Sequence, residues 1–157
     1  MNGALRSQTE IVVRVLTPDD LEAVVAIDAK STGRRRDEYF RIKLRQNLTE
    51  TGIMVSLAAE AGGSFRGFLL ARVYYGEFGS VEPVAVLDTL GVHPDWRRQG
   101  IGQTLMDQLL VNLAGLGVPT LRTEVAWEDT ALLGFFQRQR FRPAARLCLE
   151  LPVTHRP

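Results

Sequence analysis

Two arginines followed by two glycines form the part of the chain best suited to holding a charged ligand. They lie in the segment Arg97-Arg98-Gln99-Gly100-Ile101-Gly102-Gln103, named here the glycine loop. The apolar stripe that starts at Ile101 predicts a helix, and the first amides of a helix carry partial positive charge. Glycine lets the backbone approach a ligand closely, and the two arginines add full charges. The glycine loop is therefore predicted to bind a diphosphate.

Two familiar nucleotide-binding patterns do not fit this loop. A dinucleotide-binding fingerprint requires a third glycine at the position of Leu105. A Walker loop requires Gly-Lys-Ser/Thr, which does not follow the second glycine. The alternative that remains is an ordinary basic loop in front of a helix.

A strand and a helix must position the glycine loop. The run 84–92 is apolar and β-branched, which predicts a buried strand, and Pro94 ends it because proline has no N–H for a ladder. After the loop, apolar residues recur every four positions, which predicts a helix packed on a core. These residues are Ile101, Leu105, Leu109 and Leu113.

The rest of the chain predicts an α/β fold. The further expected strands are 11–16, 53–60, 65–74, 120–127 and 146–151, and the further helices start at Thr17-Pro18-Asp19-Asp20 or cover 36–48 and 129–139. The Gly-Gly pair at 62–63 predicts a hairpin turn between two of the strands. An antiparallel start followed by a strand–helix–strand unit predicts a mixed sheet with helices on both faces.

Composition excludes several function classes. A chain of 157 residues with a net charge of +1 suits one domain without a general attraction to nucleic acid or membranes. The only cysteine, Cys148, rules out an internal disulfide, and no metal cluster is expected. No apolar run approaches membrane-spanning length and the start lacks a secretory segment, so a cytoplasmic location is expected.

The densest charge cluster lies between residues 34 and 45. It consists of Arg34, Arg35, Arg36, Arg41, Lys43 and Arg45. Such runs are usually exposed, and a solvated helix face is the preferred interpretation. The alternative is a region that contacts the substrate or the ribose phosphate of a nucleotide.

The pattern Arg97-x-x-Gly100-x-Gly102, after a strand that ends in Val92-His93-Pro94, resembles the coenzyme A pyrophosphate loop of the GNAT superfamily of N-acetyltransferases. The resemblance is strongest over 87–141. It implies an α/β fold with a mixed, mostly antiparallel sheet, a splayed parallel central pair and helices on both faces. Together with the chain length, this predicts a single acetyltransferase domain over 1–157, with 1–10 flexible and 152–157 as a tail.

The activity that the resemblance implies is transfer of an acetyl group from acetyl-CoA to a primary amine, by direct attack in a ternary complex. Backbone groups of the strand would hold the pantetheine arm, and an N–H near Leu90 or Val92 would polarise the acetyl carbonyl. The coenzyme-binding residues so implied are Leu90, Gly91, Val92, Arg97, Arg98, Gln99, Gly100, Ile101, Gly102, Gln103, Asp129, Phe135 and Phe136. An amine acceptor is the second partner.

A carboxylate must take a proton from the acceptor ammonium. The segment around Glu124 resembles that of N-terminal alanine acetyltransferases of ribosomal proteins, whose catalytic glutamate matches this residue. An acid on a covered central strand is costly without a role, which also favours Glu124. Asp88 on the neighbouring strand is the second candidate. The alternatives are an ion pair of Glu124 with Arg122, and an Asp88 bonded to the backbone.

The chain departs from the family pattern at three positions. Phe136 stands where a tyrosine is common, Arg140 where glycine is usual, and Asp129 where asparagine is common. The tyrosine is often assigned as the acid that protonates the leaving thiolate. Water, the incoming amine or another hydroxyl (Tyr74, Tyr75 or Thr89) would replace it. The alternative is a non-catalytic acyl-CoA-binding or regulatory domain.

The expected strand 146–151 bears on whether the protein forms a dimer. Only about ten residues run from Phe141 to Leu151, too few for the two closing strands of many family members, and the 146–151 strand alone would leave an exposed edge. A second subunit commonly covers such an edge, so a homodimer is expected.

Overall fold

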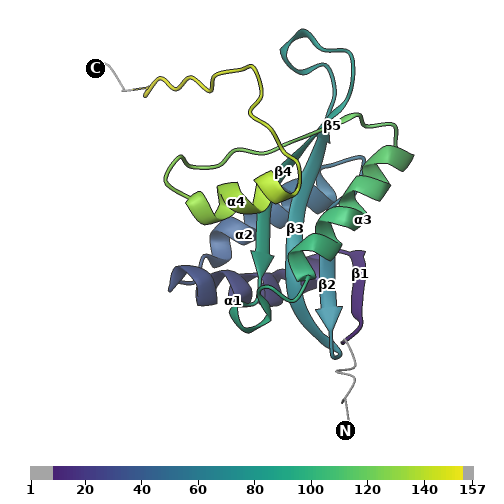
Figure 1. Ribbon diagram of the computed structural model, residues 1–157, viewed down its shortest axis with the longest axis vertical. Coiled ribbons are helices and arrows are strands. Elements are labelled where there is room, and N and C mark those ends of the chain that lie inside the picture. Colours follow the sequence, from purple (N-terminus) through teal and green to yellow (C-terminus); the bar gives the residue numbers. More distant parts are fainter. Residues whose placement is uncertain (1–8, 154–157) are drawn as a thin grey trace, which may run out of the picture. The chain divides into compact units, whose positions relative to one another are not determined.

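The computed structural model describes residues 9–153, which divide between Glu124 and Val125 into two compact units (Figure 1). The first unit contains the whole sheet of the described chain. The predicted flexible start and tail lie largely outside the described residues. The single domain over 1–157 stays a prediction.

The sheet of the described residues has five strands in the order β1-β2-β3-β4-β5 (Figure 1). Their bounds are Ile11–Val15, Leu57–Ala61, Ser64–Tyr74, Val84–Val92 and Thr120–Arg122. The first four strands pair antiparallel, and β5 pairs with β4 in parallel. The predicted mixed, mostly antiparallel sheet is confirmed.

The β2–β3 hairpin is built as its glycines predict. Gly62 and Gly63 both have positive φ, at 60° and 72°, as a two-residue turn that matches the twist of the strands requires. Strand β2 begins at Leu57 rather than at the predicted 53. Just before it, the buried Ser56 hydroxyl bonds both the N–H and the carbonyl of Ala71, a contact that replaces a backbone ladder.

Helices cover both faces of this sheet, as predicted. Helices α1 (Leu21–Thr32) and α2 (Asp37–Leu44), with the wider turn η2 (Arg45–Thr49), pack on the face that carries Phe68. Helix α3 (Ile101–Gly115) packs on the other face. The stripe predicted for α3 is buried, with Ile101, Leu105, Leu109 and Leu113 all in the core. The other two helices and η2 bury Val24, Val25, Ile27, Phe40, Leu44 and Leu48.

The parallel pair parts early. Its ladder covers only Val84–Val86 against Thr120–Arg122, whereas β4 continues to Val92. Beyond the ladder, the Thr123 hydroxyl donates a 2.9 Å hydrogen bond to the carbonyl of Leu87, in place of a backbone bond. The prediction of a strand over 120–127 is therefore wrong after Arg122, because the neighbouring backbone is no longer in register.

Strand β4 contains a bulge at Asp88. Leu70 pairs with Thr89 and Ala71 pairs with Leu87, so Asp88 is the extra residue on β4. A bulge bends its strand and redirects a side chain. No feature of the sequence predicted it.

The second unit holds α4 (Thr130–Arg138), close to its predicted bounds. The N–H of Arg140, at φ 65°, donates to the Gln137 carbonyl, and that of Phe141 donates to Phe136. This pair of bonds is a Schellman motif, and the rings of Phe136 and Phe141 lie 4.9 Å apart, which supplies its apolar contact. Arg140 therefore occupies a conformation that glycine adopts at lower cost.

The predicted closing strand over 146–151 is wrong for the structure, which gives these residues no regular secondary structure. A single strand is not stable without a partner. The described part of the second unit contains no other strand with which this segment could pair.

Two absences concern the described residues alone. No helix within 9–153 is long and apolar enough to cross a bilayer. No group of three or more histidine, cysteine or acidic side chains there could hold a metal ion.

Helix α1 is tied to the turn after β4. Lys30 Nζ lies 2.8 Å from Nε2 of His93, and Arg97 Nη2 donates a 2.9 Å bond to the Ser31 hydroxyl. Burial and the Lys30 cation lower the pKa of His93, and nearby Arg66 acts in the same direction while Asp95 opposes them. The folded protein therefore prefers neutral His93.

We expect this preference to make stability depend on pH. A depressed pKa in the folded state adds stability above the ordinary value of about 6.5, and this stability is lost as pH falls below it. Chemical denaturation at several pH values should show wild type losing more free energy of unfolding than His93→Gln between neutral and mildly acidic pH. Parallel curves for the two proteins would contradict the prediction.

Candidate active site

The glycine loop has the backbone geometry of an anion site. Gly100, at φ 88°, forms the N-cap of α3 in the left-handed region. The first backbone bond of the helix runs from Thr104 to the Gly100 carbonyl at 2.9 Å, and the Thr104 hydroxyl donates to the same oxygen. The amides of Ile101 and Gly102 thus precede the ladder of the helix and can donate to a ligand.

Two glutamines of the loop form hydrogen bonds within the chain. Gln99 Nε2 donates to the Asp95 carbonyl at 3.0 Å, and Gln103 Nε2 donates to Asp107 at 2.7 Å. Arg97 and Arg98 are exposed, and Arg98 adopts a φ of 59°. The loop therefore combines helix amides with two exposed cations, the combination that suits phosphate oxygens.

A missing side chain on β3 places the loop. A Cβ built on Gly67 would lie 2.6 Å from Cγ2 of Ile101, the buried first residue of α3. On the same strand, the Arg66 guanidinium lies 4.7 Å from the ring centroid of Trp96, just before the loop. Sequence reasoning missed both residues, because both contacts join segments that are far apart in the chain.

The end of β4 offers backbone groups on its far side. The His93 N–H donates to the Arg66 carbonyl at 2.8 Å, which fixes the alternation of the antiparallel ladder. Leu90 and Val92 then turn their N–H and C=O groups away from β3, where the ladder with β5 has ended. Gly91 packs instead: a Cβ on it would lie 2.4 Å from the Phe68 ring.

The two candidate bases differ in their surroundings. Asp88 lies at the bulge, where Lys43 Nζ approaches its Oδ2 to 2.9 Å. Burial lowers the pKa of Lys43, but the Asp88 hydrogen bond and charge outweigh burial and raise it. Asp88 is thus paired with the side chain of Lys43. The alternative prediction, an Asp88 bonded to the backbone, is not observed in the described residues.

Glu124 lies two residues beyond β5 and is exposed. Glu124 is therefore not the covered acid that the sequence predicted, and burial gives no reason for it to have a role. Within the described residues, no ion pair joins Glu124 to Arg122, so the proposed structural pairing is not observed.

The charge cluster 34–45 is mainly an ion-paired helix surface. Except for Arg34, each member contacts a carboxylate; the pairs are Arg35–Glu22, Arg35–Asp37, Arg36–Asp28, Arg41–Glu38, Lys43–Asp88 and Arg45–Glu50. Of these pairs, only Lys43–Asp88 reaches a candidate site residue. The preferred interpretation holds for most of the cluster.

The remaining site candidates belong to the second unit. Asp129 caps α4, because its carboxylate accepts a 3.0 Å bond from the Leu132 amide. The rings of Phe135 and Phe136 lie edge to face at 5.3 Å. Among the candidate hydroxyls of the first unit, Tyr74 and Tyr75 are exposed and Thr89 is half-buried.

Comparison with known proteins shows similarity to acetyltransferases. The sequence pattern of the acetyltransferase (GNAT) family matches residues 21–141. An acetyltransferase of Pectobacterium atrosepticum is 26% identical over 129 residues, which cover 82% of this chain and 86% of the relative.

Solved structures with the same fold include two acetyltransferases. An aminoglycoside N-acetyltransferase in complex with CoA superposes with a TM-score of 0.76 at 18% identity, over 92% of this chain and 95% of the other. A ribosomal-protein-alanine N-acetyltransferase from Brucella melitensis gives 0.74 at 18% identity, over 92% and 100%.

The glycine loop at the start of α3, the parted β4–β5 pair and the match over 21–141 lead to one conclusion. The chain belongs to the GNAT family and is an N-acetyltransferase that transfers an acetyl group from acetyl-CoA to an amine.

Proposed function

We propose that the glycine loop binds the diphosphate of acetyl-CoA and that the far side of β4 binds its pantetheine arm. The positive φ of Gly100 and the helix amides after it support the first assignment. The outward N–H and C=O groups of Leu90 and Val92 support the second, because they offer the hydrogen bonds of a strand edge. The co-substrate supplies an acetyl group activated as a thioester.

Replacement of Gly100 by glutamate should abolish coenzyme binding. A side chain at φ 88° costs about 1–2 kcal/mol locally, and a carboxylate would repel the diphosphate. Calorimetric titration with coenzyme A checks the affinity, and circular dichroism checks the fold.

The matched control is Gly76→Glu, which adds the same charge at a φ of 71° in the loop that follows β3. This control should bind the coenzyme as wild type does. Unchanged affinity in Gly100→Glu would remove the loop from the coenzyme site.

We further propose that Glu124 is the general base, with Asp88 as the second candidate. Glu124 follows the strand next to β4 and forms no ion pair within the described residues, so it is available to take a proton. Asp88 is already engaged by Lys43 at 2.9 Å. A carboxylate that holds a lysine in this way must exchange that partner before it accepts a proton.

Glu124→Gln should lower kcat by about 10²–10⁴-fold, the usual contribution of a general base, with little change in coenzyme affinity. The expected effect of Asp88→Asn on kcat is smaller. Steady-state kinetics over a range of pH checks both, with the exposed Glu82→Gln as control. A larger loss in Asp88→Asn than in Glu124→Gln would exchange the two roles.

The leaving thiolate receives its proton, in this proposal, from water or from the incoming amine. Phe136 has no proton to give, and its ring is engaged with Phe141 at the end of α4. A thiol has a pKa of about 8.5, so its thiolate leaves without strong acid assistance. Loss of a general acid slows a reaction but leaves the other contributions in place.

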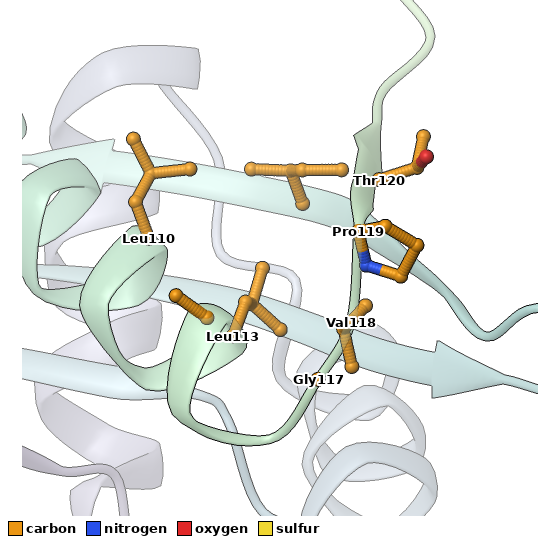
Figure 2. Close-up of a pocket in the computed structure, with 8 residues that line it drawn as sticks. Leu110, Leu113, Gly117, Val118, Pro119 and Thr120 are labelled. Atoms are coloured by element: carbon orange, nitrogen blue, oxygen red, sulfur yellow. The ribbon is translucent and has the colours of Figure 1, made fainter.

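We also propose a homodimer that covers the open edge of β5. Beside this strand, the end of α3 and the 117–121 segment line an apolar hollow of about 440 Å³. Figure 2 shows Leu110 and Leu113 of α3 facing the segment from Gly117 to Thr120 across it. Leu110 remains 44% exposed. An unpaired edge next to apolar surface suits a second copy of the chain.

Sedimentation velocity should therefore show a dimer of the wild type, and Leu110→Glu should shift it toward the monomer because a charge would enter the contact. Gln108→Glu, a change of charge at a polar position of α3, serves as control. A wild type that is monomeric at every concentration would contradict the proposal.

The remaining expectations stay predictions. They are a cytoplasmic location, the absence of nucleic-acid and membrane partners, and a single domain over 1–157. The family match supports the last of these, because it spans the boundary between Glu124 and Val125. The acceptor is a primary amine of a small molecule or of a peptide.

A further inference from the structure

A small hollow beside Asp88 gathers groups of both charges. Its walls come from the end of α2 with the turn η2, from β3 and from β4, and its volume is about 60 Å³. The polar side chains that line it are Lys43, Gln46, Asn47, Arg72, Tyr74 and Asp88. A water molecule occupies about 30 Å³ in the liquid, so the hollow admits one small polar group rather than a whole acceptor.

The charges that line the hollow do not balance. Lys43 is matched by Asp88 at 2.9 Å. Arg72 is half-buried, and its guanidinium lies 5.5 Å from the ring centroid of Tyr74. Within residues 9–153, no carboxylate forms an ion pair with Arg72. A cation that loses part of its hydration without a counter-ion is costly, which points to an anion from outside the chain.

The ammonium of Lys43 is engaged by Asp88, so it does not compete for that anion. Nδ2 of Asn47 donates a 2.8 Å bond to the backbone carbonyl of Lys43. Asn47 is only 4% exposed, so its amide is fixed in the wall of the hollow. Arg72 is consequently the cation of the hollow that is left for an anionic ligand.

We propose that Arg72 binds a carboxylate of the amine acceptor. A guanidinium presents two parallel N–H donors that match the two oxygens of a carboxylate, and the Tyr74 ring supports its plane. The substrate class is then an amine that also carries a carboxylate. This inference rests on the proposed function, since it requires the acceptor to approach β4 on the side of Asp88.

Paired acceptors test the inference. Each pair consists of an ω-amino acid and the alkylamine of the same chain length, and the lengths increase across the panel. With wild type, kcat/KM for the amino acid of the best pair should exceed that for its alkylamine by at least about tenfold. Arg72→Met should bring this ratio close to one, and Arg72→Lys should retain part of it. Arg45→Met removes a cation of η2 that pairs with Glu50 outside the hollow, and it should keep the wild-type ratio.

Equal rates for both members of every pair, or a preference that survives Arg72→Met, would overturn the inference and leave the acetyl transfer intact. If wild type acetylates no amine in the panel, the proposed acceptor chemistry fails. Calorimetric titration of wild type and Arg72→Met with the same pairs then tests whether Arg72 binds a carboxylate. Binding of an amino acid that is weakened in Arg72→Met supports the anion site. Binding that is the same in both proteins, or absent from both, overturns it.

Discussion

The early end of the β4–β5 ladder is the constraint on which the rest of the site depends. The two strands are hydrogen-bonded only from Val84 to Val86, and β4 continues without that neighbour. Antiparallel alternation then directs the backbone groups of Leu90 and Val92 away from β3. A fully paired β5 would use those groups, and no strand edge would remain for the pantetheine arm. The bulge at Asp88 lies where the parting begins.

The two faces of the sheet carry different parts of the proposed site. On one face, α3 starts against β3. The amides at its N-terminus follow β4 in the chain after a short turn. On the other face, α2 brings Lys43 to Asp88 and encloses the hollow that contains Arg72. The coenzyme and the acceptor can therefore be bound by different elements that share β4. Changes in acceptor preference need not disturb coenzyme affinity.

Local patterns in the sequence predicted the features that depend on local physics. Periodicity predicted α3 with its buried stripe, the Gly-Gly pair predicted the hairpin, and the loop pattern predicted the family. The failures involve partners that are distant in the chain. The bulge at Asp88 depends on register with β3, and the closing strand over 146–151 depends on a neighbour that alternation cannot supply. Lys43 was grouped with the solvated charges because the sequence does not show that it reaches β4.

Gly67 joins the stability of the sheet to the shape of the coenzyme loop. Glycine is a poor strand former, so a β-branched residue at this position would strengthen β3 considered alone. Any such side chain would displace Ile101, and with it the first turn of α3. Attempts to make the enzyme more heat-resistant by consensus strand residues should therefore leave this position unchanged. Strand β3 is therefore locally weaker at this glycine, and the space above it allows the first turn of α3 to pack close to the sheet.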